Sequence, residues 1–245
     1  MATEKATAIV LRTSDWSESS RIATLWTREL GKVRALAKGG RRLKSSFESG
    51  LDLLTVCSIV LIRKSAGLDL LTEAQVARRF RRLAGDLEAL YGAYFVAELL
   101  ADWTTDLDPN PPVFDEAVAA LDDLSQDGRR VAPRVLRFTM VFLRETGFLP
   151  ALDTCAGCGA GLYEQGLGFS ASAGGVLCPA CWTGHADRKP LSVQGWRALR
   201  ALAAGGDWGR SATGPACSEL RPLLGDFLTH LRGRPPKLLP YLGGG

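Results

Sequence analysis

The sequence has very little histidine and no long apolar run. Only two histidines, His185 and His230, occur among its 245 residues, and no Walker-type phosphate-binding loop is present. Charges interrupt every apolar segment before it reaches the roughly 18 to 20 residues that a membrane-spanning helix needs. The N-terminus has no charged segment followed by a long apolar one, so we expect no secretory signal. These absences leave few candidates for catalysis and indicate a cytoplasmic protein with no membrane partner.

Charge of both signs is present but unevenly distributed. Residues 1–82 contain 16 lysines and arginines against 8 aspartates and glutamates, which gives a net charge of +8. Residues 83–245 contain 14 against 18, which gives −4. A polyanion such as nucleic acid gains free energy from every neutralised phosphate. We therefore expect such a partner to bind the N-terminal third.

The first 80 residues predict a small β-barrel. Short segments rich in β-branched and aliphatic residues are separated by glycine-containing turns, as in a sheet of short strands. The predicted strands are residues 7–11, 21–26, 32–36, 53–62 and 68–76. Five short strands in a segment of this length favour an oligonucleotide-binding (OB) barrel, and an SH3-like barrel is the alternative.

The apolar period changes after the predicted barrel. From Phe80 to Ala101, apolar residues recur at alternating steps of three and four, which predicts one long helix. Further helices are predicted at residues 113–124, 132–146, 192–203 and 216–231, followed by an extended, frayed tail. The fold class is therefore α+β and multidomain. The predicted domains are an OB barrel (1–79), a helical bundle (80–150 and 190–235) and an inserted zinc-ribbon-like module (151–189).

Two Cys-x-x-Cys pairs, Cys155 with Cys158 and Cys178 with Cys181, are separated by 19 residues. A hairpin formed by residues 168–170 and 175–177 would bring the pairs together. Four thiolates with no open coordination position are typical of one structural zinc ion. Two redox pairs or an iron–sulfur cluster are the alternatives, but a redox motif normally begins a helix that follows a strand.

The cysteine segment itself is acidic. Between Asp153 and Thr183 there is no lysine or arginine, and there are two acids, Asp153 and Glu164. With four thiolates and one Zn²⁺ adding −2, the module carries about −4 by formal count, which does not suit a phosphate backbone. We therefore expect the zinc to brace the neighbouring helices, and we expect no contact between this module and DNA.

The densest positive run lies between Arg28 and Lys44, where seven basic residues accompany one acid. Lys32 and Arg34 are two apart on a predicted strand and so share one face of the sheet. Such runs are often only solvated faces, but the further arginines of the same domain favour phosphate binding. Trp16, in the preceding loop, is a candidate for stacking on a base.

The segment SDWSESSRIATLWTRELGKVRALAKGGRRLKSSFESGLDLL, residues 14–54, resembles the N-terminus of the bacterial RecO family of DNA repair and recombination mediators. The shared features are the Glu18–Ser19 dipeptide, a Gly-Lys strand and a Lys-Gly-x-Arg-Arg-x-x-Ser stretch. The order of barrel, helices and cysteine module is also similar, so the resemblance covers about residues 5 to 230. One departure is Ser17, where the family typically has glycine.

The resemblance implies an OB barrel, a helical bundle and a zinc module without catalytic activity. It implies a cytoplasmic, nucleoid-associated protein that binds single- and double-stranded DNA and anneals strands coated with single-stranded-DNA-binding protein (SSB). It also implies that the protein acts with RecR to load the RecA recombinase. The DNA contacts carried over from the family pattern are Lys32, Arg34, Lys38, Arg41, Arg42 and Lys44.

A second basic stripe lies along the predicted helix 132–146 and just before it. The arginines of this stripe are Arg130, Arg134, Arg137 and Arg144, and the apolar residues beside it are Val131, Val135, Phe138 and Phe142. Such a pair of stripes would suit a short acidic peptide with an apolar end, and RecO relatives are thought to bind the acidic SSB tail. The alternative is a solvated arginine face beside a core-facing apolar row.

Two other functional classes remain as alternatives. A zinc-ribbon transcription factor would explain zinc and DNA binding, but it predicts basic residues on the ribbon. A nucleic-acid-processing enzyme would need a carboxylate cluster with Mg²⁺ or an activated nucleophile. The acidic pairs Asp106/Asp108 and Asp122–Asp123 have no third partner nearby in the sequence.

Overall fold

A computed structural model of the chain describes residues 2–41, 47, 50–126, 131–205 and 214–242. It forms two compact units, Met1–Gly128 and Arg129–Gly245. The described residues form a five-stranded sheet, a small three-stranded sheet and six α-helices, so the predicted α+β class is confirmed. The three-part domain plan predicted from the sequence differs from this division and stays a prediction.

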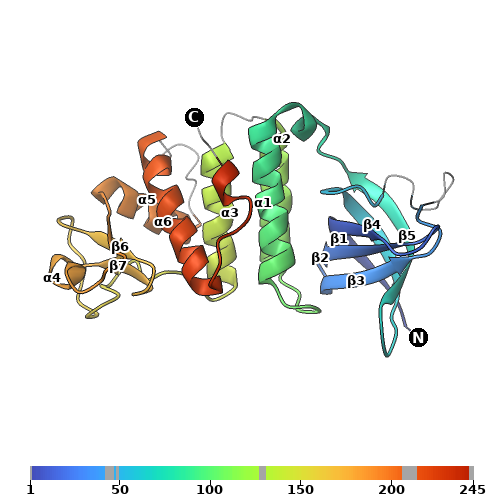
Figure 1. Cartoon of the computed structure of the whole chain (residues 1–245), viewed down its shortest axis with the longest axis horizontal. Helices are drawn as coiled ribbons and strands as arrows, with labels where there is room; N and C mark the ends of the chain where they lie inside the picture. Colours follow the sequence, from blue (N-terminus) through green and yellow to red (C-terminus); the bar gives the residue numbers. More distant parts are fainter. Residues whose placement is uncertain (1, 42–46, 48–49, 127–130, 206–213, 243–245) are drawn as a thin grey trace. The chain divides into compact units, whose positions relative to one another are not determined.

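The five strands of the first unit pair in the order β1-β2-β3-β5-β4, and β1 also pairs with β4, so the sheet closes on itself as a barrel (Figure 1). The strands are β1 (Thr3–Asp15), β2 (Arg21–Thr27), β3 (Gly31–Ala37), β4 (Val56–Ile62) and β5 (Asp69–Arg78). Four of the pairings are antiparallel, and β3 pairs with β5 in parallel. All five strands lie where the sequence predicts them.

Alternation along each strand fills the inside of the barrel with small and aliphatic side chains. On β3, Val33, Ala35 and Ala37 are buried in the inner core, while Lys32 and Arg34 face outward. Because successive side chains point to opposite faces of a sheet, the pattern Gly-Lys-Val-Arg-Ala-Leu-Ala separates the two environments without exception.

Part of the outer barrel surface is also buried. Ile9 on β1 lies opposite Trp26 on β2, and Trp26 lies opposite Lys32 on β3. Ile9 and Trp26 lie outside the inner core, yet each is only 1% exposed. Helix α1 (Leu87–Trp103) contacts both β1 and β2, so this outward row lies beneath the helix.

Helix α1 begins later than the apolar spacing predicts. A 3-10 helix, η1 (Arg81–Gly85), comes first, and the backbone at Asp86 is extended. The Asp86 carboxylate accepts a hydrogen bond from the Ala89 amide at 3.0 Å, which caps the new helix. The predicted single helix from Phe80 is therefore wrong, and Leu87, assigned to its buried face, is 63% exposed.

The second unit combines three mutually packed helices with the cysteine module. The helices are α3 (Val131–Glu145), α5 (Val193–Ala203) and α6 (Gly214–Arg232), and in the first unit α2 (Pro111–Gln126) packs on α1. The module contains β6 (Gly168–Ser170), β7 (Gly175–Leu177), α4 (Pro179–Trp182) and β8 (Lys189–Pro190). The predicted hairpin is confirmed as β6 and β7, and Phe169 of β6 packs edge-on against Phe227 of α6 at 5.8 Å between ring centroids.

The end of the chain folds back onto α6. Residues Leu239–Tyr241 form a short 3-10 helix, η4, and the Leu239 side chain lies close to Gly225 of α6. Leu242 is only 4% exposed. The predicted frayed tail is therefore wrong as far as Leu242, because its leucines find apolar surface on α6. Among the described residues, no helix combines the length and apolar character needed to cross a membrane.

A close approach between backbones fixes the start of β3. Gly31 has a φ of 72°, and a Cβ atom there would lie 2.5 Å from the Asp108 backbone. We expect Gly31→Ala to lower the free energy of unfolding by about 3 kcal/mol or more, because backbone strain and a steric clash add. Gly67→Ala is the control: φ is 81°, but nothing lies within 4 Å, so we expect a loss of only about 1 kcal/mol. Equal losses in denaturant unfolding would contradict a tight joint at Asp108.

Candidate functional site

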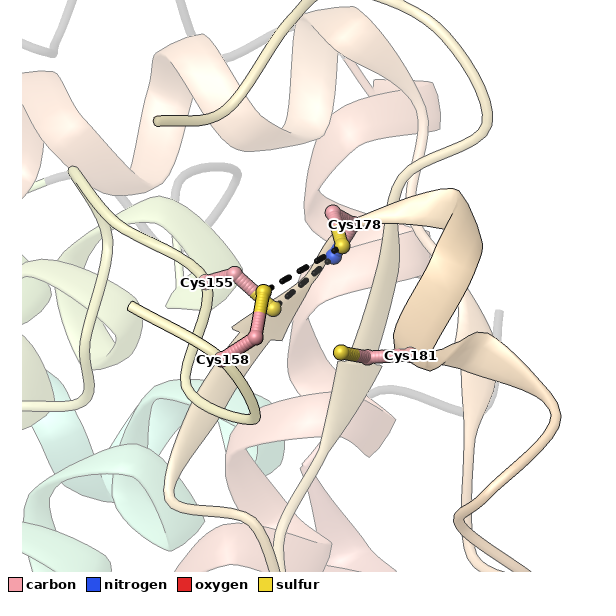
Figure 2. Close-up of side chains that lie close together, drawn as sticks. All are labelled: Cys155, Cys158, Cys178 and Cys181. Atoms are coloured by element: carbon pink, nitrogen blue, oxygen red, sulfur yellow. Dashed lines mark hydrogen bonds between the residues drawn. The ribbon is translucent and has the colours of Figure 1, made fainter. Parts of the chain in front are cut away.

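The four predicted metal ligands come together at one end of the small sheet. Cys155 and Cys158 lie on the loop before β6, whereas Cys178 directly follows β7 and Cys181 lies in α4. Figure 2 shows the four sulfur atoms pointing toward one another from these two segments. Three of the four residues are buried or half-buried, and Cys158 is exposed.

The sulfur positions fit a tetrahedral metal ion. All four Sγ atoms lie within 4.8 Å of one another, and the Sγ atoms of Cys158 and Cys178 are 3.8 Å apart. A zinc ion with bonds of about 2.3 Å to four thiolates places its sulfur ligands about 3.8 Å apart. The four cysteines can therefore hold a metal ion.

The thiols differ in how readily they ionise. Burial opposes ionisation of Cys155, but backbone N–H groups of Cys178, Cys158 and Gly157 outweigh it and lower the pKa of the Cys155 thiol to about 6. The Cys178 amide, for example, donates to the Cys155 Sγ at 3.3 Å. Hydrogen bonds with the neighbouring sulfurs of Cys158 and Cys155 raise the pKa of Cys181 to about 12. Four such close sulfurs ionise together only when a cation balances them.

The module is tied to α5 through two of its acids, Glu164 and Asp153. Arg197 forms two short hydrogen bonds with Glu164, at 2.6 and 2.7 Å, and Arg200 bonds to Asp153 at 2.7 Å. The Trp196 indole donates to the Leu152 carbonyl oxygen at 2.7 Å. The acids that make the cysteine segment negative are thus paired with arginines of the neighbouring helix.

In another part of the module, hydrogen-bond donors surround the Asp187 carboxylate, and we call this arrangement the Asp187 cage. Asp187 accepts hydrogen bonds from the hydroxyls of Ser170 and Ser172, both at 2.7 Å, and from the Ser172 amide at 2.8 Å. Partial burial opposes ionisation, but these bonds outweigh it and hold the pKa of Asp187 well below its usual range. The cage fixes the loop between α4 and β8 against β6.

The six predicted DNA contacts differ in their surroundings, and the structure describes four of them. Arg34, on β3, and Lys38, just after it, are exposed on the barrel, and neither has a carboxylate partner among the described residues. Arg41 is held by the β1–β2 loop: its guanidinium donates to the Ser17 carbonyl oxygen at 2.9 Å and lies 3.5 Å from Asp15. Arg42 and Lys44 lie outside the described residues.

Lys32 occupies a different environment from the other candidates. Its ammonium donates to the carbonyl oxygens of Ala101 at 2.8 Å and Thr104 at 2.6 Å, and it lies 3.3 Å from the Asp106 carboxylate. These three partners match the three donors of an ammonium group, and the side chain is only 12% exposed. A cation at this position also suits the negative end of the α1 dipole. This role could not be predicted from the sequence, because the partners are about seventy residues away.

The tryptophan named as a stacking candidate is accessible. Trp16 lies in the β1–β2 loop, close to the segment that bonds Arg41, and is 64% exposed. Its backbone amide donates to the Ser20 carbonyl oxygen at 3.0 Å, which closes the loop. Trp16 therefore presents an aromatic face next to Ser17, the residue whose carbonyl oxygen binds Arg41.

The second predicted site, on α3, is only partly described. Arg130 lies outside the described residues, and Arg134 and Arg137 are half-buried and take part in interactions within the protein. The apolar row beside them, Val131, Val135, Phe138 and Phe142, is buried in the core of the second unit. Arg144 at the end of the helix donates to the Ala203 carbonyl oxygen at 3.0 Å.

Two family models together match nearly the whole chain. The family model "Recombination protein O N terminal" matches residues 1–80, and "Recombination protein O C terminal" matches residues 84–240. This chain belongs to the RecO family. The resemblance, which covers about residues 5 to 230, is thereby confirmed, and RecO membership assigns the chain to DNA repair and recombination.

Similar RecO proteins align along nearly their full length. "DNA repair protein RecO" of Rhodopirellula baltica is 38% identical over 96% of this chain and 97% of the relative. The protein of the same name from Anaeromyxobacter sp. strain K is 38% identical over 94% and 92%, respectively. That of Roseiflexus sp. strain RS-1 is 31% identical over 96% and 83%.

The Asp187 cage makes stability depend on pH. Because its pKa in the folded protein is lowered, Asp187 stabilises the fold above the pKa of an unfolded aspartate, about 3.9, and loses this effect as the pH falls below it. We expect Asp187→Asn to lower the free energy of unfolding by about 1 kcal/mol at pH 6, since the carboxylate is largely exposed. The difference from the unmodified protein should narrow only below about pH 4. A difference that stays constant down to pH 3 would contradict a role for the charge.

Proposed function

We propose that this RecO-family chain is a non-catalytic recombination mediator. It binds single- and double-stranded DNA through the barrel, anneals complementary strands, and acts with RecR and SSB to load RecA. The observation that carries the proposal is the pair of exposed cations, Arg34 and Lys38, next to the Arg41 and Trp16 segments. Arg42 and Lys44 extend the same basic stretch in the sequence.

We propose that the barrel is of the OB type. The closed order β1-β2-β3-β5-β4 with a parallel β3–β5 pair supports this assignment. OB barrels bind nucleic acid on the face of strands 2 and 3 and on the loops that join strands 1–2 and 4–5. In this chain that face carries Arg34, and the first of those loops carries Trp16.

We attribute strand annealing to contacts that the protein makes with phosphates and not with base edges. Side chains that neutralise phosphates on two strands reduce the repulsion between them. If few base edges are contacted, the Watson–Crick groups stay free to pair. Arginine and lysine on an open strand face supply such contacts, and Trp16 adds a stacking surface that does not depend on base identity.

Within this proposal, Lys32 is a positioning residue. Its three bonds to the end of α1 and the following loop leave no donor for a phosphate. It acts on DNA binding by fixing the helix against the barrel, next to the strand face that carries Arg34. The proposed direct contacts are Arg34, Lys38, Arg41, Arg42 and Lys44.

The acids considered for catalysis support a non-enzymatic role. Asp106 pairs with Lys32 at 3.3 Å, and Asp122 pairs with Arg78. Asp122 thus holds α2 to the barrel, and Asp106 holds the loop that follows α1. The alternatives, a nucleic-acid-processing enzyme and a zinc-ribbon transcription factor, are less favoured for this reason and because the cysteine module pairs its acids with α5.

We propose that the four cysteines hold one structural zinc ion. Zinc forms closed tetrahedral sites with four thiolates, and the 3.8 Å separation of Cys158 and Cys178 suits this geometry. When bound, the ion supplies charge balance and a covalent brace between two loops. The protein partners that we propose are RecR and the SSB tail, the latter at Arg134 and Arg137 together with Arg130, which precedes them in the sequence. The proposed location is the cytoplasm, at the nucleoid.

Charge reversal on the open strand face tests the DNA contacts. We expect the wild-type protein to show a slope of log affinity against log salt of about −3 to −4 on a single-stranded oligonucleotide, from five phosphate contacts. Arg34→Glu with Lys38→Glu should weaken binding at least about 20-fold at 0.1 M salt and make the slope shallower by about 1.4. The measurement is fluorescence anisotropy with a labelled poly-dT strand.

A matched control distinguishes contacts at this face from the effect of the protein's overall charge. Lys5 is exposed on β1 outside this face, and Lys5→Glu changes the same charge at a single site. Lys5→Glu should weaken binding much less than Arg34→Glu alone. Equal losses would contradict a defined DNA face, and a wild-type slope shallower than about −1 would contradict phosphate binding altogether.

Removal of zinc ligands tests the brace. We expect Cys155→Ser with Cys158→Ser to abolish zinc binding and to lower the thermal midpoint by several degrees, because the ion contributes directly to folding. Zinc content by elemental analysis and thermal unfolding measure the two effects. Folded zinc-free protein that kept its thermal midpoint but lost DNA binding would show that the module contacts DNA.

A further inference from the structure

A row of three outward side chains crosses the open part of the barrel face. Arg12 of β1 lies opposite Thr24 of β2, and Thr24 lies opposite Arg34 of β3. Adjacent strands are about 4.8 Å apart, so the Cα atoms of the two arginines are about 10 Å apart. This row is the first one beyond Ile9–Trp26–Lys32, which α1 covers.

An irregularity in β1 places Arg12 in this row. The register between β1 and β2 shifts between Val10 and Arg12, so that Arg12 pairs with outward-facing Thr24. Strict alternation from inward-facing Val10 would also point Arg12 inward. Instead, its side chain is 64% exposed, which makes it one more accessible cation beside Arg34.

Arg12 is held only loosely by the protein. Its Nη2 atom lies 3.7 Å from the Asp102 carboxylate of α1, beyond hydrogen-bond distance. In contrast, Arg28 makes two hydrogen bonds of 2.9 Å with Asp115. Arg12 is exposed and Asp102 is half-buried, with a side chain that is 20% exposed. At 3.7 Å the contact is an ion pair without a hydrogen bond, so the exposed guanidinium can exchange it for another anion.

We infer that Arg12 is a further DNA-phosphate contact and that Asp102 is the anion it exchanges for a phosphate. This inference rests on the proposed function of the barrel. A guanidinium binds carboxylate and phosphate with the same forked geometry, so the exchange requires only rotation of the Arg12 side chain. DNA brings many phosphates, and each one bound also releases counterions, which favours the phosphate.

Neutral replacement of Arg12 tests the contact. Arg12→Gln should weaken binding of the labelled poly-dT strand about fivefold at 0.1 M salt and make the salt slope shallower by about 0.7, the share of one single-strand phosphate. Lys5→Gln, which removes a cation elsewhere on β1, should leave both quantities within error. Thr24→Lys should do the reverse of Arg12→Gln, because it places a new cation between the two arginines.

A double-mutant cycle tests the exchange. If Asp102 competes with phosphate for Arg12, Asp102→Asn should tighten binding in the unmodified protein, by up to about fivefold, and should leave Arg12→Gln unchanged. If Asp102→Asn tightened DNA binding equally in the unmodified protein and in Arg12→Gln, Asp102 would act only through the overall electrostatic field of the protein. That result would overturn the exchange. Thermal unfolding of each variant confirms that the fold is kept.

The outcomes also separate this inference from the proposed function. If Arg34→Gln weakens binding while Arg12→Gln and Thr24→Lys leave it unchanged, the Arg12 contact is wrong and the DNA face stands. If the unmodified protein shows no salt-dependent binding, the proposed function fails and the inference fails with it. Weakening by Arg12→Gln together with tightening by Thr24→Lys supports both.

Discussion

The arrangement of the first unit depends on the ammonium group of Lys32. It joins β3 to the last carbonyl oxygens of α1 and to Asp106, and next to it Gly31 allows the Asp108 backbone to approach closely. Together these contacts press the helix onto the outer row of Ile9 and Trp26. The Gly-Lys dipeptide, which looks like part of a basic run, therefore works as a structural joint, and the position of this joint decides which part of the barrel face stays open.

Acids in the segment that follows the barrel also neutralise several of its cations. Four carboxylates between residues 102 and 122 pair with barrel cations: Arg12 with Asp102, Arg28 with Asp115, Lys32 with Asp106 and Arg78 with Asp122. The net charge of residues 1–82 thus overstates the cations available to DNA. Arg34 and Lys38 have no such partner among the described residues, and Arg12 has a loose one. Pairing by neighbouring acids therefore limits the proposed DNA-binding face as much as the positions of the basic residues do.

Local patterns in the sequence predicted the strands, the hairpin at residues 168–170 and 175–177 and the four cysteines, because alternation, glycine turns and ligand spacing act over short distances. They misplaced the start of α1, where the Asp86 cap outweighs a continuous apolar period. They also missed the structural role of Lys32 and the role that we infer for Arg12. Those roles depend on partners about seventy residues or more away and on one register shift in β1, which no local pattern reports.

The joint at Lys32 has a consequence for work with isolated domains. A fragment that ended near residue 80 would coincide with the boundary of the N-terminal family match, yet it would lack α1 and the four acids between residues 102 and 122 that pair with the barrel. Ile9 and Trp26 would then face water, and the cations at positions 12, 28, 32 and 78 would lose their carboxylate partners. Such a fragment would tend to associate through these exposed apolar side chains. Its measured affinity for nucleic acid would exceed that of the intact protein. The natural unit for biochemistry therefore ends after α2.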